Sequence, residues 1–116
     1  MQNIFLIGFT ILFAVASTAQ AADKTVKCEI ESNAVRVFNG KCKFMPEAGG
    51  SFSLSNFSEK PLFDEITIVS VTIIEKGIAE VRGLTTRGNN SRWGEAKRSS
   101  KDQACWVGAD FKICAR

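Results

Sequence analysis

The sequence contains no histidine and no tyrosine, so it lacks two residue types that often serve in acid–base catalysis. Without histidine, a Ser-His-Asp triad cannot form. The four cysteines form no CxxC pair, because thirteen residues separate Cys28 from Cys42 and eight separate Cys105 from Cys114. This spacing, together with the missing histidine, argues against a zinc site. We therefore expect neither a metal nor a cofactor.

The chain also lacks a phosphate-binding loop, which is a common catalytic signature. It contains no internal repeat and no convincing amphipathic helix. Two pairs of carboxylates could resemble a glycosidase pair, Glu29 with Glu31 and Asp64 with Glu65, but they occupy ordinary solvent-facing positions. We predict that the protein is not an enzyme.

Residues 1–21 have the pattern of a secretory signal peptide. Ile4 to Ala16 is an apolar run without a charged residue, and Ala19-Gln20-Ala21 supplies a small-x-small cleavage site. The run is short for a membrane span, which makes a retained N-terminal anchor the less favoured alternative. We expect an exported, periplasmic protein, cleaved near Ala21 and without a membrane anchor.

The remaining residues, 22–116, suffice for one small domain with a modest core. Four cysteines in an exported chain of this length indicate two disulfides, each worth about 2–4 kcal/mol.

The sequence favours one of the possible pairings of the four cysteines. The segment between Cys105 and Cys114 predicts a hairpin that turns at residues 108–110 and places the two cysteines directly opposite each other. Cys28 would then pair with Cys42. The competing pattern, Cys28–Cys114 with Cys42–Cys105, stays open, because sequence does not fix connectivity.

Apolar residues alternate with polar ones along most of the domain, which is typical of half-buried strands. Asn39-Gly40 predicts a two-residue hairpin turn. In the longest apolar stretch, Ile66 to Ile74, the alternation slips between Ile68 and Val69 and suggests a bulge. About eight short strands with regular turns predict an all-β fold, a small antiparallel barrel.

Basic character is concentrated between Arg82 and Lys101. This segment holds six basic residues and one acid, a net charge of +5, in a chain whose total is +3. It is polar and turn-rich, and we expect at least part of it to be a binding loop. Nucleic acid is a poor candidate partner, because the overall charge is small and the protein is expected to be exported.

The core of this segment is Gly88 to Gly94, and we predict that Ser91, Arg92 and Trp93 lie at its tip. Trp and Arg are favoured at binding hot spots. The alternatives are structural: Ser91 could bond to its own turn, and Trp93 could fold back onto the core.

Sequence motifs spread over most of the domain, from Asn39-Gly40-Lys41-Cys42 to Ile113-Cys114-Ala115, resemble a family of small exported proteobacterial proteins. More loosely, the domain is similar to the periplasmic and membrane-bound inhibitors of c-type lysozyme. In that family a small β-barrel inserts a Ser-Gly-rich loop ending in Arg-Tyr into the lysozyme cleft. The resemblance implies that Gly88 to Trp93 takes the place of this loop, with Arg92-Trp93 standing for Arg-Tyr.

The sequence therefore favours a periplasmic inhibitor of c-type lysozyme that blocks the cleft with residues 87–98. The alternative is a binding module for an anionic envelope glycan or lipid head group, and a homodimer stays open. The predicted lysozyme-binding residues are Arg87, Asn89, Asn90, Ser91, Arg92, Trp93, Lys97 and Arg98.

Overall fold

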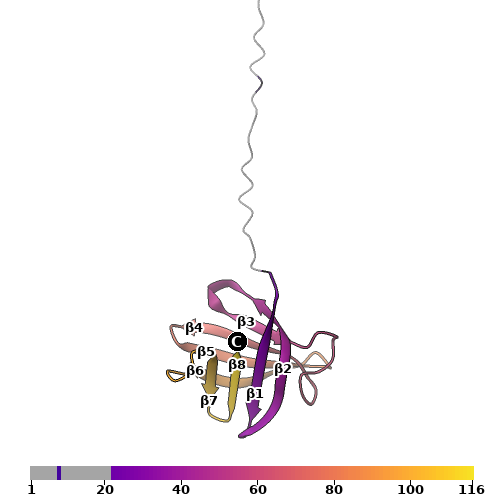
Figure 1. Ribbon diagram of the computed structural model, residues 1–116, viewed down its shortest axis with the longest axis vertical. Coiled ribbons are helices and arrows are strands. Elements are labelled where there is room, and N and C mark those ends of the chain that lie inside the picture. The colour runs from indigo at the N-terminus through magenta and orange to yellow at the C-terminus, as the bar shows by residue number, and fades with distance from the viewer. Residues whose placement is uncertain (1–7, 9–21) are drawn as a thin grey trace, which may run out of the picture.

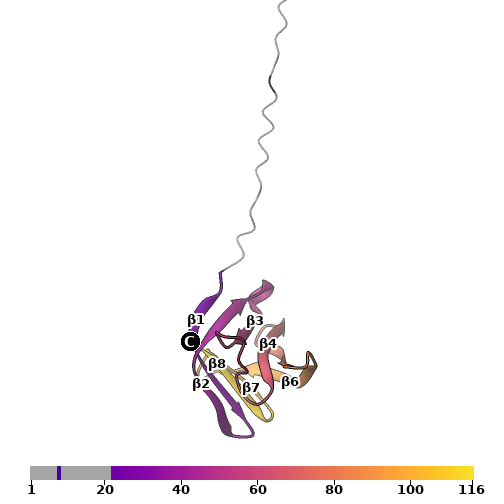
Figure 2. The ribbon, with the colours of Figure 1, turned by 90° about the vertical axis from the view of Figure 1, so that its right-hand side faces the viewer.

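The computed structural model describes Gly8 and residues 22–116. Residues 22–116 form a closed antiparallel barrel of eight strands (Figures 1 and 2). Each strand pairs with the next in sequence, and β8 closes the barrel by pairing with β1. The strands are β1 (Lys24–Ser32), β2 (Val35–Pro46), β3 (Phe52–Ser55), β4 (Ile66–Glu75), β5 (Ile78–Thr85), β6 (Asn90–Arg98), β7 (Cys105–Gly108) and β8 (Phe111–Ala115).

The all-β fold and the count of eight strands confirm the prediction from sequence. The one helix in the described residues is a single 3-10 turn, η1 (Ala48–Gly50), so that part of the chain holds no helix long and apolar enough to cross a membrane. The predicted signal peptide, residues 1–21, lies outside the described residues apart from Gly8.

The core fills the inside of the barrel, because side chains alternate between the two faces of every strand. Its fully buried members come from seven of the eight strands, all except β7. They are Cys28, Ile30, Cys42, Leu54, Val69, Val71, Ala79, Val81, Ala96 and Ile113.

Both locally paired disulfides are present, Cys28–Cys42 and Cys105–Cys114. Cys28–Cys42 joins β1 to β2 within the core. Cys105 and Cys114 are direct partners in the β7–β8 hairpin, whose two-residue turn lies between Gly108 and Phe111. Their neighbours Trp106 and Ile113 point into the core, so this second disulfide lies on the outer face of the barrel.

Two local predictions were wrong. Asn39 and Gly40 lie inside β2, and the first hairpin turns at Asn33-Ala34, whose φ angles are 51° and 64°. Positive φ at both central residues is the geometry of a tight hairpin turn that follows the twist of the strands. The irregularity expected between Ile68 and Val69 falls earlier, as a shift of register between Ile66 and Ile68.

Candidate functional site

The segment predicted as a long loop is mostly strand. β6 begins at Asn90, so the β5–β6 turn contains only residues 86–89, and of the residues expected to block a cleft, 87–98, only 87–89 lie outside a strand. Backbone hydrogen bonds from Thr85 N to Asn89 O (2.8 Å) and from Gly88 N to Thr85 O (2.9 Å) hold the turn. The Thr85 hydroxyl adds a bond from Asn89 N, and Gly88 supplies a φ of 80°. Arg87 is therefore presented on a well-defined turn.

Ser91 has a structural partner. Its hydroxyl donates to the carbonyl oxygen of Gly83 on β5 at 2.8 Å, and its side chain is partly buried. The expectation that Ser91 lies at a loop tip is wrong, because the residue lies in β6.

Trp93 packs against the core instead of standing at a loop tip. Its ring centroid lies 5.7 Å from those of both Phe63 and Phe111. A β-bulge precedes Gly94, where the β5–β6 register shifts between Val81 and Arg82, and Gly94 has a φ of 112°. The bulge lets both Trp93 and Ala96 face the interior, although three positions separate them. Trp93 helps to close one end of the barrel.

Arg92 faces outward and is 72% exposed. Its Nε atom lies 2.8 Å from a carboxylate oxygen of Glu80, and Nη2 of Arg82 lies 3.2 Å from the same oxygen. Arg82 and Arg92 are direct partners across β5 and β6. Two arginines thus share one carboxylate, and this cluster is net positive.

Lys97 and Arg98 belong to a different region. They end β6, whereas the turn with Arg87 precedes its start, and a strand of this length spans roughly 26 Å. Arg98 instead lies over the Trp106 ring at 5.5 Å. The predicted binding residues therefore divide into three groups: those of the turn and the exposed start of β6 (Arg87, Asn89, Asn90, Arg92), those that support the turn (Ser91, Trp93) and those at the far end of β6 (Lys97, Arg98).

The turn belongs to a hairpin that extends past its neighbour. β5 and β6 stay paired as far as Leu84 and Asn90, whereas the pairing of β6 with β7 stops at Ala96 and Gly108. The first half of β6 therefore has a strand on one side only. A crevice of about 190 Å³ lies beside it, lined by Ser32, Arg92, Trp93, Asp110 and Phe111. On the other side, Thr86 N donates to Glu65 O at 2.8 Å and braces the turn.

Next to the arginine pair, the outer face of the barrel has a shallow hollow of about 380 Å³ that the sequence interpretation missed. Polar side chains line it: Glu47, Ser70, Thr72, Glu80, Arg82 and Asn90. The available signal was the alternation of Ser70 and Thr72 with Val69 and Val71, which places both hydroxyl groups on the outer face.

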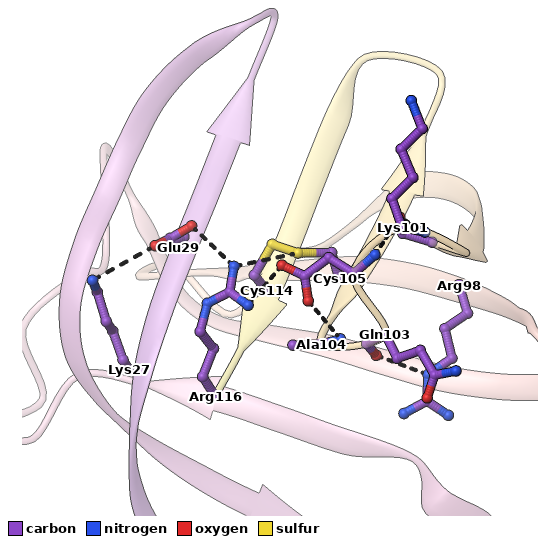
Figure 3. Close-up of a disulfide and its surroundings, with 11 residues drawn as sticks. Lys27, Glu29, Arg98, Lys101, Gln103, Ala104, Cys105, Cys114 and Arg116 are labelled. Atoms are coloured by element: carbon purple, nitrogen blue, oxygen red, sulfur yellow. Dashed lines mark hydrogen bonds and ion pairs between the residues drawn. A yellow bond between two sulfur atoms is a disulfide. The ribbon is translucent and has the colours of Figure 1, made fainter.

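A second charged cluster covers the outer disulfide (Figure 3). Arg116 follows β8 and reaches back over Cys105, with Nη2 3.9 Å from its sulfur. The same guanidinium lies 2.6 Å from Asp102 and 3.7 Å from Glu29. The hydrogen bond from Arg116, supported by one from Ala104 N, lowers the pKa of Asp102, and Asp102 in turn raises the pKa of Arg116. This network ties the C-terminus to β1 and to the β6–β7 loop.

Within residues 22–116, acidic and cysteine side chains do not gather in a group of three or more that could hold a metal ion. Comparisons with protein-family models, with curated proteins and with solved structures find no match for this chain.

Proposed function

We propose that the protein is an exported inhibitor of c-type lysozyme that blocks the catalytic cleft with the β5–β6 turn. The observation that carries the proposal is the hairpin extending past β7 with Arg87 exposed on its turn. On its β7 side this hairpin has no neighbouring strand, and a turn presented beside such a free edge suits a concave partner surface.

The chemistry of the turn supports the same partner. A lysozyme cleft holds two catalytic carboxyl groups, of which one is ionised at neutral pH. A guanidinium can bind an ionised carboxylate through a charge-assisted, bidentate hydrogen bond. Arg87 is the cation that we assign to this contact. Arg92, five residues further along the chain, would bind at the rim of the cleft.

The surrounding residues favour tight binding by limiting the entropy lost on association. The turn has three internal hydrogen bonds and a fourth to Glu65 O. Trp93 and Ser91 fix β6 beneath it by packing and by the bond to Gly83. A loop that is already ordered has less conformational freedom to lose when it binds.

A bacterial-lysis turbidity assay tests this proposal. The protein to use is residues 22–116, which contain the whole barrel and both disulfides. We expect a several-fold excess to suppress lysis and Arg87→Ala to lose at least tenfold in potency. Lys76→Ala, in the β4–β5 turn at the opposite end of the barrel, is the matched control and should retain full potency. Undiminished lysis in the presence of the wild-type protein contradicts the proposal.

The hollow beside Glu80 favours a second candidate, a binding module for an anionic envelope glycan. Its hydroxyl, amide and carboxylate groups can exchange hydrogen bonds with sugar hydroxyls, while Arg82 and Arg92 attract the negative charge. This candidate predicts sedimentation with cell-wall material that weakens steeply with salt. Thr72→Val and Arg82→Ala should each reduce this sedimentation, and the protein should leave lysozyme activity unchanged.

A further inference from the structure

The two ends of the barrel differ. One end is filled by aromatic rings, with Trp93 between Phe63 and Phe111. The other end holds a cavity of about 280 Å³, which we call the barrel mouth, lined chiefly by Phe44, Phe52, Ile73, Arg98, Trp106 and Ala115. We propose that the barrel mouth binds a small amphiphilic carboxylate.

Aromatic and aliphatic side chains line one part of the mouth, and the polar residues Arg98 and Gln103 line another. Phe44 and Phe52 stack with their ring centroids 4.9 Å apart and their planes 22° from parallel. Phe52 and Trp106 are almost fully buried, so packing within the barrel holds both rings in place. Such a surface stabilises an acyl chain or a flat ring by burying apolar area.

One cation lies at the rim of these walls. Arg98 donates a hydrogen bond from Nε to Gln103 O at 2.9 Å (Figure 3), and its guanidinium lies over the Trp106 ring. Among the residues that the structure describes, no carboxylate forms an ion pair with Arg98. Asp102, from the same loop as Gln103, pairs with Arg116 instead. The two Nη groups of Arg98 thus remain to bind a carboxylate through the geometry that guanidinium favours.

The size of the cavity sets the size of the ligand. Sites for drug-sized ligands usually measure about 300–1,000 Å³, and the mouth lies just below that range. A medium-chain fatty acid or a single-ring aromatic acid fits this volume, with its apolar part against Phe44 and Ile73, which are partly exposed, and its carboxylate at Arg98. This ligand site is separate from the β5–β6 turn and does not depend on the proposed inhibition of lysozyme.

Calorimetric titration of residues 22–116 with octanoate at neutral pH tests the inference, with octan-1-ol and octylamine as neutral and cationic probes. We expect octanoate to bind at least tenfold more tightly than either, because only octanoate can pair with Arg98. Arg98→Gln should reduce octanoate affinity about tenfold, while Lys97→Gln, its outward-facing neighbour, should leave it unchanged.

A measurement on the wild-type protein makes the test independent of variant folding. In a two-dimensional NMR titration with octanoate, the Trp106 indole and the Ile73 methyl signals should shift, and the Trp93 indole signal should not. Absence of shifts at millimolar octanoate overturns the proposal. Equal binding of octan-1-ol also overturns it, because the affinity would then owe nothing to Arg98.

Discussion

The indole of Trp93 lies directly against Gly83 of the neighbouring strand. A Cβ atom at position 83 would lie 2.8 Å from Nε1 of the indole, closer than real Cβ atoms approach other heavy atoms. The carbonyl oxygen of the same glycine accepts the Ser91 hydroxyl. One residue of β5 therefore positions two of the three side chains that the sequence assigned to a loop tip, Ser91 and Trp93.

Substitution of Gly83 by Ala should destabilise the barrel by about 1–3 kcal/mol, because the added methyl group displaces the indole from its packing. Urea unfolding followed by circular dichroism measures the effect. Gly40→Ala is the matched control, since Gly40 also lies within a strand and no atom lies within 4 Å of its added Cβ. The control should stay within about 0.5 kcal/mol of wild type. Equal stability of the two variants would contradict the packing described for Trp93.

Removal of the Trp93 ring should lower the stability of the fold. Any loss of partner binding should follow from this lower stability. We expect Trp93→Ala to lower the free energy of unfolding by about 3 kcal/mol, because the ring packs against Phe63 and Phe111. Arg92→Ala, one residue away and largely exposed, should change it by less than about 1 kcal/mol. A Trp93→Ala protein as stable as Arg92→Ala would show that the ring does not stabilise the fold.

The position of Trp93 differs from the one expected, whereas other features of the fold were predicted correctly from the sequence pattern. Period-two alternation predicted the strands, and the direct opposition of Cys105 and Cys114 predicted their disulfide, because both features are local. The polar character of Asn90 to Trp93 resembled a loop. In the barrel these residues are strand, with the exposed members on the outer face and a bulge at Gly94 that shifts the alternation. A bulge of this kind depends on pairing with β5, which single-sequence patterns do not contain.

The first hairpin was misplaced for a related reason. Asn39-Gly40 has the strongest local turn preference, yet the chain turns at Asn33-Ala34, where Ala34 takes a φ of 64° that alanine disfavours. With the turn at this position, β1 pairs with β8 as far as Ser32 and Phe111, and this pairing closes the barrel. The pairing of β1 with β8 outweighs the turn preference of Asn39-Gly40, because closing the barrel satisfies the backbone hydrogen bonds of a whole strand.

The Asp102–Arg116 pair should make stability depend on pH. Because the pKa of Asp102 is lowered in the folded state, its ionised form favours folding at pH values above its unfolded pKa of 3.8. This contribution is lost as the pH falls through the lower folded value. Asp102→Asn should therefore be less stable than wild type near neutral pH, and the difference should shrink toward about pH 2.

Urea unfolding at a series of pH values measures this difference. Asp23→Asn is the matched control, because Asp23 also pairs with a cation but with a different one, Lys43, at 3.5 Å. A gap between wild type and Asp102→Asn that stays constant with pH would contradict the role of the ionised carboxylate.

The two disulfides should contribute unequally to stability. Cys28–Cys42 lies in the core and closes the longer loop, with a separation of 14 residues against 9 for Cys105–Cys114. Its replacement by two alanines leaves space between packed strands, whereas the outer pair is covered by the long side chain of Arg116, which can move into the vacated space. We expect the double variant Cys28→Ala/Cys42→Ala to lose about 1 kcal/mol more than Cys105→Ala/Cys114→Ala. Urea unfolding of both variants under non-reducing conditions measures the difference, and a larger loss for the outer pair would show that Arg116 does not compensate for the missing sulfurs.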